Sequence, residues 1–487
     1  MPRTAPVRLQ YGPLTVFLAS RHGCPDLDPL ARSLGETQPL VWLDSARCHP
    51  VTGRWSLLGF DPWLTCTARG DRLELHTSAS TRHWRANPFT ALRRILRDYR
   101  AQAAPRRSRH MALGGVQRAI GLLGFLSYDL NRFIERLPEP QPADPGTPDM
   151  RWDAMKSVVL IDHLLQRHWL IAVADPHLPK PLAVRDALDG FARLEAALGG
   201  EAASGEEPLP TTPVEATSTQ AEFEAMVARA LEHIRAGDIF QANVSQRFTA
   251  RWPGDPLSLY RRLRRINPSP FACYLRSPEL SVVSCSPERL VRVQDGRVDA
   301  RPIAGTRPRG GSPEEDAVRG LELLLSDKER AEHIMLVDLA RNDLGRICRV
   351  GSVTVHELMA LESYSHVIHI VSDVGGALRP GADAVEVIRA VFPGGTITGC
   401  PKVRCMQILR DLEPVARGLY TGSIGWLGFD GTMDLNIAIR TMVLRGGRLA
   451  FHVGAGIVAD SDPEREYHET LAKAEAMMQA VSDAPHR

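Results

Sequence analysis

The sequence predicts a layered α+β fold, in which helices cover sheets made of neighbouring strands. Short apolar runs of the kind that form strands come in adjacent pairs, and segments with helical spacing of apolar residues stand between the pairs. This alternation favours separate helix and strand layers over one parallel sheet. The chain has 487 residues, of which 44% are hydrophobic, so a substantial core and more than one subdomain are expected. No short-period repeat is visible.

The first part of the chain is predicted to consist mainly of strands. Its clearest apolar runs are 40–43, 122–126, 157–161 and 168–173. Residues 199–220 are rich in Ala, Ser, Thr, Glu and Pro and have no apolar period, which predicts a surface linker. We therefore divide the chain into an N-terminal region (1–198), a linker (199–220) and a C-terminal region (221–487).

The C-terminal region is predicted to alternate helices with groups of strands. Helical spacing over 223–236 ends before Gly237, which suits a C-cap. The further helices expected are 313–326, 327–340, 384–392, 401–412 and 463–481. The strands expected are 239–250, 272–275, 280–285, 290–293, 421–429, 433–444 and 449–458.

Charge and cysteine usage exclude several classes of protein. The 59 basic and 57 acidic residues leave a net charge of +2, which gives no reason to expect nucleic acid or an anionic membrane as partner. No apolar stretch approaches the roughly 18 residues of a transmembrane helix, and the N-terminus lacks the apolar core of a secretory signal. The 8 cysteines form no Cys-x-x-Cys pair. We expect a cytoplasmic protein with reduced thiols.

Two pairs of glutamates stand three residues apart within predicted helices. Glu329 and Glu332 form one pair, and Glu466 and Glu469 form the other, with Lys473 one turn further on. Residues at this spacing share a helix face, so each pair repels unless a cation lies between the carboxylates. Hard oxygen ligands at this density suit Mg²⁺. The spacing alone leaves open a second interpretation, two amphipathic helices with exposed ion pairs.

Two glycine-rich turns are candidate anion sites. Residues 394–401 read Gly-Gly-Thr-Ile-Thr-Gly-Cys-Pro and precede a predicted helix, with Lys402 next in the chain. Glycines let a backbone approach a ligand, and free N–H groups at a helix start bind carboxylates. The turn 454–456 follows a predicted strand and could contact the same anion. A tight loop that only caps a helix is the alternative.

Three single residues are candidates on weaker grounds. Arg440 ends an apolar run, so it is either an edge residue facing water or a buried ligand of a carboxylate. His369 lies in a strand-like stretch, where a lone histidine is more often structural. Glu288 follows Ser-Pro and is a candidate general acid.

In their order along the chain, these segments resemble the chorismate-utilising enzyme family. The motifs are Pro-Ile-Ala-Gly-Thr-Arg-Pro-Arg-Gly at 302–310, Asp-Lys-Glu-Arg-Ala-Glu-His at 327–333 and Glu-Tyr-His-Glu-Thr at 466–470. The resemblance is strong over 223–479 and weaker at 53–59 and 124–129. It implies a four-layer α/β/β/α fold with two intertwined subdomains. It also makes 221–487 the chorismate-binding catalytic domain and 1–198 a region similar to component I of anthranilate synthase.

The resemblance implies a role for each candidate residue. Around Mg²⁺ it places Glu329, Glu332, Glu466 and Glu469, with Glu332 and Glu469 as the most direct ligands. The metal would bind the ring carboxylate of chorismate and help the C4 hydroxyl to leave. Other residues match the substrate pocket: Arg440 and Tyr420 as ligands of the enolpyruvyl carboxylate, Lys473 beside them, and Thr306, Thr396 and the backbone of Gly454, Ala455 and Gly456 as its lining. Glu288 matches the general acid for the departing hydroxyl, and His369 lies beside that group.

Gln241 separates amination from hydration. Family members that add water have a lysine at this position as general base, and a glutamine amide cannot accept a proton at neutral pH. Ammonia already carries a free electron pair, so we expect ammonia to be the nucleophile. No Gly-x-Cys-x-Gly nucleophile elbow is present, so ammonia is expected from solution or from a glutamine amidotransferase subunit in a heterodimer.

Two amination products remain after this step. Many aminodeoxychorismate synthases have a nucleophilic lysine where this chain has Ala304, and anthranilate synthases do not. Five other segments are more similar to aminodeoxychorismate synthases: 127–130, 392–399, 412–414, 431–441 and 457–461. We therefore expect 4-amino-4-deoxychorismate, a precursor of 4-aminobenzoate and folate, with anthranilate and pyruvate as the alternative. The segment 43–45 is similar to the region where anthranilate synthases hold tryptophan, with Asp44 in place of the usual glutamate.

Overall fold

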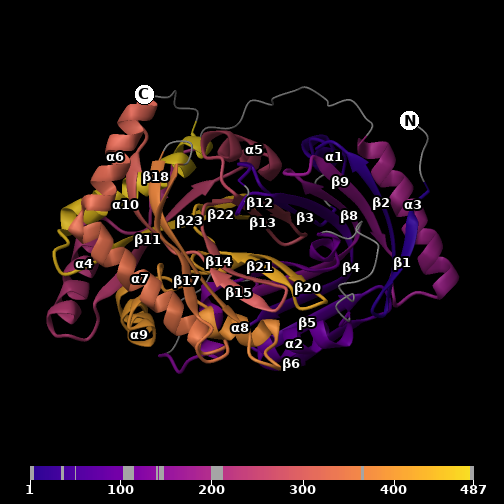
Figure 1. Ribbon diagram of the computed structural model, residues 1–487, viewed down its shortest axis with the longest axis horizontal. Helices are drawn as coiled ribbons and strands as arrows, with labels where there is room; N and C mark the ends of the chain where they lie inside the picture. Colours follow the sequence, from indigo (N-terminus) through magenta and orange to yellow (C-terminus); the bar gives the residue numbers. More distant parts are fainter. Residues whose placement is uncertain are drawn as a thin grey trace.

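The computed structural model describes residues 5–34, 38–49, 51–101, 115–138, 141, 147–198, 212–363 and 367–482. Figure 1 shows strands running through the middle of the molecule and helices on its outer sides. Mixed helix and antiparallel sheet confirm the predicted α+β class. Residues 199–211 of the expected linker lie outside the described residues, and 212–220 contain a short strand and the start of a helix.

The first part of the chain is built mainly from strands. They are β1 (Val7–Tyr11), β2 (Leu14–His22), β3 (Leu40–Asp44), β4 (Trp55–Arg69), β5 (Arg72–Thr77), β6 (Thr81–Arg85), β7 (Gly121–Leu126), β8 (Met150–Asp162) and β9 (Arg167–Val173). The helices are α1 (Asp28–Ser33), α2 (Pro88–Asp98), α3 (Lys180–Leu198) and two 3-10 turns, η2 (Val116–Ala119) and η3 (Tyr128–Phe133).

The second part mixes both element types. Its strands are β10 (Glu215–Ala216), β11 (Gln241–Arg251), β12 (Phe271–Arg276), β13 (Ser281–Ser286), β14 (Arg289–Gln294), β15 (Arg297–Ala300), β16 (Ile303–Pro308), β17 (Thr354–Ser363), β18 (Val367–Ala377), β19 (Gly399–Cys400), β20 (Ser423–Gly428), β21 (Met433–Asn436), β22 (Thr441–Arg445) and β23 (Arg448–Ile457). Its helices are α4 (Gln220–Arg235), α5 (Pro256–Ile266), α6 (Pro313–Leu325), α7 (Asp327–Gly345), α8 (Ala384–Val391), α9 (Lys402–Leu412) and α10 (Pro463–Val481).

The two parts of the chain share their sheets. Strand β3 pairs with β12 antiparallel, and β7 pairs with β20, so strands from before residue 198 and after residue 220 hydrogen-bond directly. One large apolar core joins residues of both parts, from Val16 to Ile437. A second core lies beneath α3, α5 and α10, and a third lies under α4 and α9. This arrangement agrees with the intertwined subdomains that were expected.

Local sequence explains where the site-bearing helices begin. Ser326 caps α7 by accepting a hydrogen bond from the backbone N–H of Glu329, and Asp462 caps α10 with Pro463 in the first turn. These caps place Glu329 and Glu466 in the first turn of their helices, and Glu332 and Glu469 follow one turn later. The expected helix 463–481 is confirmed residue for residue.

The expected single strand over 433–444 is wrong. The chain forms β21 and β22 with a break between them, and Arg440 within the break has a φ of 51°. This left-handed conformation cannot continue a strand. Backbone hydrogen bonds to two other segments stabilise the break. The Ile437 N–H donates to the carbonyl of Glu288, and the Thr421 N–H donates to the carbonyl of Ala438.

Candidate active site

The pairing of β11 with β23 brings Gln241 next to the glycine segment 454–456, which was expected to be a turn and instead lies within strand β23. In this register Asn243 faces Gly456 and Ser245 faces Gly454. A Cβ atom on Gly456 would lie 2.9 Å from Nε2 of Gln241. A Cβ atom on Gly454 would lie 2.7 Å from Oη of Tyr420 and 2.9 Å from the carbonyl of Val244. Both glycines therefore keep space open beside polar groups, as an anion cradle needs.

Filling this space is expected to weaken binding of the ring substrate. We expect Gly454→Ala to raise its KM by roughly tenfold, equivalent to about 1.4 kcal/mol, because the methyl group displaces Tyr420. Gly345→Ala is the matched control, because Gly345 ends α7 and a Cβ there meets nothing within 4 Å. Steady-state kinetics with chorismate measure the KM of the Gly454→Ala and Gly345→Ala variants. An unchanged KM in Gly454→Ala would show that Gly454 does not contact the substrate.

The two glutamate pairs face each other across the gap between α7 and α10. Gln241 donates from Nε2 to Glu332 at 3.2 Å, and Lys328 at the start of α7 pairs with Asp460 just before α10 at 3.2 Å. Glu469 pairs with Lys473 at 2.7 Å, and Nζ of Lys473 also donates to the carbonyl of Gly454 at 3.1 Å. One carboxylate of each pair is thus connected to the glycine segment, Glu332 through Gln241 and Glu469 through Lys473.

The charges of these carboxylates are mutually unfavourable. Burial, followed by the negative charges of Glu329 and Glu469, raises the pKa of Glu332. Burial also raises the pKa of Glu466, and Glu469 adds to this effect. Positive charge comes from Arg307, at 3.0 Å from Glu329, from Lys473, and from Lys328, which acts on Glu466. A divalent cation would relieve this repulsion.

The donor set fits Mg²⁺ in its chemistry. All four side chains offer carboxylate oxygens, which this ion prefers, and they come from the helices α7 and α10. Among the described residues, no three His, Cys, Asp or Glu side chains already close on one point. Glu469 is held by Lys473, and Glu466 accepts from Oγ of Ser461 at 2.7 Å. Binding a metal here therefore requires these side chains to rotate.

A second group of predicted residues surrounds Glu288. Glu288 is 7% exposed, and its carboxylate accepts a hydrogen bond from Oγ1 of Thr396 at 2.9 Å. Burial raises the pKa of Glu288 to about 7, while the bond from Thr396 and the charge of Arg440 oppose this shift. A carboxyl group with this pKa is partly protonated at neutral pH, as a general acid must be.

Arg440 is neither an edge residue nor part of a strand. Its guanidinium lies near Glu288 and His369, and burial lowers its pKa. Nη1 donates to Oδ1 of Asn267 at 3.3 Å, and among the described residues no carboxylate lies within ion-pair distance. A half-buried arginine with an amide partner retains charge for a carboxylate ligand.

His369 and Thr306 face each other on paired strands. Strand β16 pairs with β18, with Ala304 opposite Ile370 and Thr306 opposite His369 across a bulge. Nδ1 of His369 lies 3.0 Å from Oγ1 of Thr306 and 3.1 Å from the carbonyl of Gly305. Burial lowers the pKa of His369 to about 4, so the ring is neutral at pH 7.

Comparison with known proteins identifies the family. A model of chorismate binding enzymes matches residues 52–479. The chain belongs to this family. It is 40% identical over 445 residues to aminodeoxychorismate synthase component 1 of Bacillus subtilis, covering 91% of each chain. It is 41% identical over 466 residues to anthranilate synthase component 1 of Synechocystis sp., covering 90% of each.

A solved structure shows the same fold. Anthranilate synthase component I from Streptococcus pneumoniae superposes with a TM-score of 0.77 at 32% identity, covering 89% of this chain and 94% of that one. The protein is therefore a chorismate-utilising enzyme, and its relatives carry the names of two different synthases. No helix in the described part of the chain is long and apolar enough to cross a membrane.

One expectation about this chorismate site needs adjustment. The side chain of Ala455 packs in the apolar core under α4 and α9, as a residue expected to offer only its backbone can. Lys402, expected beside the anion, instead pairs with Asp343 at 2.6 Å and donates to the carbonyl of Val391. Lys402 joins α9 to α7 and does not enter the site.

Three polar residues of the site were missed. Asn243 donates from Nδ2 to Oη of Tyr420 at 3.5 Å, and Asn267 holds Arg440. The ring of His452 stacks on that of Tyr420 with centroids 5.4 Å apart. Asn243 and His452 lie on paired strands, so their positions follow from the register of β11 with β23, which sequence alone does not give.

Proposed function

We propose that this protein is the chorismate-aminating component of an aminodeoxychorismate synthase. It converts chorismate and ammonia into 4-amino-4-deoxychorismate and water. The observation that carries the amination step is Gln241. Its Nε2 is used by Glu332, and its Oε1 is buried without a hydrogen-bond partner in the described structure. A buried orphan acceptor is costly, and an N–H group of ammonia would satisfy it.

The substrate would lie between the glutamates of α7 and α10 and the residues that surround Glu288. Arg440 and Tyr420 would hold the enolpyruvyl carboxylate, with the open backbone of Gly454 and Gly456 beside it. Mg²⁺, held by Glu329, Glu332, Glu466 and Glu469, would bind the ring carboxylate and act as a Lewis acid.

Proton transfer follows from the state of Glu288. As the C4–O bond breaks, protonated Glu288 gives its proton to the hydroxyl, which leaves as water. The C–N bond forms from the electron pair of ammonia, and the new ammonium group then loses a proton, which restores Glu288. His369, neutral and fixed by the carbonyl of Gly305, would position the departing group by hydrogen bonding.

Ammonia would be supplied by a glutamine amidotransferase subunit. The sequence has no glutaminase nucleophile elbow, and the relatives are named as components of two-part synthases. Gel filtration of the two purified subunits together, with glutamine-dependent activity as readout, tests this partner.

Anthranilate synthesis is the second candidate, and Ala304 is the observation that favours it. An alanine at this position has no nucleophile, so the route through a covalent lysine adduct is closed. Five segments with aminodeoxychorismate-type sequence weigh against it. Both reactions begin with the same bound substrate and the same nucleophile.

Product identification decides between the two. We expect purified protein with chorismate, Mg²⁺ and ammonium to form a product that yields 4-aminobenzoate and pyruvate only when 4-amino-4-deoxychorismate lyase is added. Chromatography with fluorescence detection and a coupled pyruvate assay measure this. Anthranilate and pyruvate without the lyase would establish the alternative. Isochorismate as main product would overturn amination altogether.

A further inference from the structure

The connection between α9 and β20 carries a buried ion pair of an arginine and a glutamate. Arg417 and Glu413 both stand in this connection, residues 413–422, and are 3% and 5% exposed. Arg417 donates from Nε and Nη2 to the two carboxylate oxygens of Glu413 at 2.8 and 2.6 Å. Burial alone would lower the pKa of Arg417, but the charge of Glu413 outweighs burial and the pKa is raised. The pair is therefore compensated internally, and Arg417 retains no charge for an anionic ligand.

The same two side chains also reach two other segments of the molecule. Nη1 of Arg417 donates to the carbonyl of Ile397, in the glycine-rich segment before α9, at 3.0 Å, and Nη2 donates to the carbonyl of Asn243 on β11 at 2.5 Å. Glu413 holds the same strand, because its Oε1 accepts from the N–H and from Oγ of Ser245 at 2.9 and 2.8 Å. One buried pair thus joins β11, the glycine-rich segment and the connection before β20.

Each of these three segments carries a candidate residue of the chorismate site. The glycine-rich segment carries Thr396, next to the carbonyl that Arg417 binds, and Oγ1 of Thr396 donates to Glu288 at 2.9 Å. Strand β11 begins with Gln241. The connection before β20 carries Tyr420, whose ring centroid lies 5.7 Å from the guanidinium carbon of Arg417. The placement of one guanidinium therefore bears on the general acid, the amide and a carboxylate ligand of the site.

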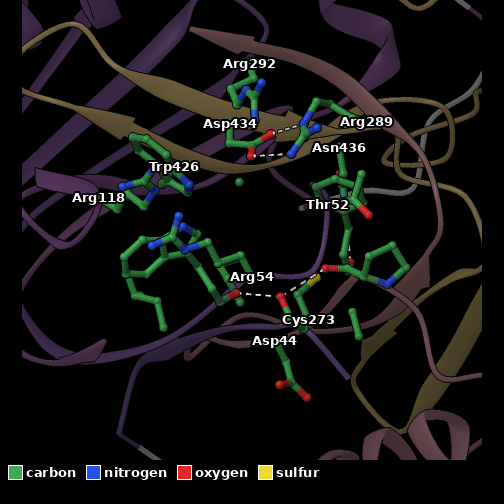
Figure 2. Close-up of a pocket in the computed structure, with 18 of the residues that line it drawn as sticks. Asp44, Thr52, Arg54, Arg118, Cys273, Arg289, Arg292, Trp426, Asp434 and Asn436 are labelled. Atoms are coloured by element: carbon green, nitrogen blue, oxygen red, sulfur yellow. Dashed lines mark hydrogen bonds and ion pairs between the residues drawn. The ribbon is translucent and has the colours of Figure 1, made fainter. Parts of the chain in front are cut away.

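A bidentate pair elsewhere in the molecule lacks this reach across segments. Arg289 donates to Asp434 with two hydrogen bonds of 2.8 and 3.0 Å, drawn in Figure 2. These two residues lie on β14 and β21, which are already paired in the sheet. That pair reinforces an existing strand contact, whereas the pair of Arg417 joins three separate parts of the chain.

We propose that Arg417 is a positioning residue of the chorismate site, which keeps Thr396 in place as a donor to Glu288 by fixing the carbonyl of Ile397. The proposal rests on the role of Glu288 as general acid in the proposed function. Arg417 touches neither substrate nor the reacting atoms in this account. It acts through the backbone of the glycine-rich segment, whose shape decides where the hydroxyl of Thr396 points.

The effect of Arg417 on Glu288 is one of position, because the charges near this carboxyl group come from other residues. Arg440 is the residue whose charge acts on the pKa of Glu288. Three more charged residues line a cavity of ≈ 40 Å³ together with Glu288, namely Arg289, Arg301 and Asp343. Within the described part of the chain, Arg417 belongs to neither set. A change at Arg417 should therefore reach Glu288 through the bond from Thr396.

Arg417→Lys tests this position without leaving Glu413 unpaired. Lysine keeps the buried charge but loses the planar fork, so it cannot reach all of these acceptors and releases the carbonyl of Ile397. The bond from Thr396 then weakens, and the pKa of Glu288 should rise by about one pH unit. Infrared difference spectroscopy of the full chain without substrate measures this titration, with Glu288→Gln to identify the band of the protonated carboxyl group. Because no reaction is needed, a chain that forms another product would contradict the proposed function and leave this test intact.

Coupling to Thr396 separates positioning from general loosening of the fold. In a Thr396→Val background the bond to the carboxylate is already absent, so Arg417→Lys should add no further rise. Arg410→Lys is the matched control, because Arg410 is also buried but donates to the carbonyl of Pro138 and to Oδ1 of Asn131. This control should leave the titration where it is in the native chain.

Kinetics give a second readout, and the outcomes that contradict the proposal are distinct. We expect kcat/KM for chorismate to fall by roughly tenfold or more in Arg417→Lys, because a misplaced donor costs that much, and to change little in Arg410→Lys. An unmoved titration in folded Arg417→Lys protein would overturn the proposal, as would a rise that persists beside Thr396→Val or appears equally in Arg410→Lys. If Arg417→Lys fails to fold, the double variant Glu413→Gln with Arg417→Gln leaves no buried charge unpaired, and the same titration decides.

Discussion

Replacing Glu332 by glutamine is expected to lower Mg²⁺-dependent turnover of chorismate by roughly a thousandfold, as loss of a metal ligand at a reacting centre usually does. The reason is its position. Glu332 accepts a hydrogen bond from Gln241. The charges of its own partner Glu329 and of Glu469 on α10 raise its pKa, so it lies close to carboxylates from both helices. The measurement is chorismate consumption against Mg²⁺ concentration.

The same substitution is expected to stabilise the metal-free protein. The folded-state pKa of Glu332 is raised by burial and by neighbouring charge, so its ionisation opposes folding. A raised pKa gives stability at low pH that is lost as pH rises through the pKa values of the unfolded and folded states. We therefore expect Glu332→Gln to raise the melting temperature at pH 7 by roughly 1–3 °C without Mg²⁺, and to raise it little at pH 4.

Opposite signs for activity and stability separate a metal role from a structural one. Added Mg²⁺ should raise the melting temperature of the native chain by mass action and leave that of Glu332→Gln nearly unchanged. Glu475→Gln is the control, because Glu475 lies on the exposed face of α10 and bonds only Gln479 in the described structure. A Glu332→Gln protein that keeps its activity would exclude Glu332 as a ligand.

The glutamate pairs could be predicted because helical periodicity is local. Residues i and i+3 share a face wherever a helix forms, and the caps at Ser326 and Asp462 can be recognised in the sequence. That the two helices face each other was supplied by the family resemblance. The same resemblance supplied the intertwined fold, which depends on pairings such as β3 with β12 across more than two hundred residues.

What sequence reasoning missed depends on three-dimensional neighbours. The run around Arg440 has the composition of a strand, and only contacts to Glu288 and Thr421 show why the strand breaks there. Lys402 follows a glycine-rich turn as an anion ligand would, but Asp343 on another helix takes its charge.

Gln241 shows how the two levels of argument combine. The residue type alone shows that its side chain is an amide, which cannot act as a base at neutral pH. The structure adds its geometry, because Nε2 is directed to Glu332 and Oε1 is left buried and without a partner. An acceptor beside a candidate metal ligand is where a neutral N–H nucleophile is held most easily.

Replacing Glu288 by glutamine is expected to lower kcat/KM by roughly a hundredfold to a thousandfold, the range for loss of a general acid. In the native chain, kcat/KM should fall as pH rises through about 7, because the carboxyl group with that pKa must be protonated to act. The Glu288→Gln variant should lose this limb of the profile. Free ammonia is held constant across the series, so that only enzyme groups titrate.

The bond from Thr396 provides a finer test of the same assignment. Oγ1 of Thr396 donates to Glu288 at 2.9 Å and thereby stabilises the ionised carboxylate. Thr396→Val removes this donor, so the pKa of Glu288 should rise and the falling limb should move to higher pH. Thr398→Val is the matched control in the same loop, because Thr398 donates to the carbonyl of Gly394 instead. A limb that keeps its position in Thr396→Val, or persists in Glu288→Gln, would assign the titration to another group.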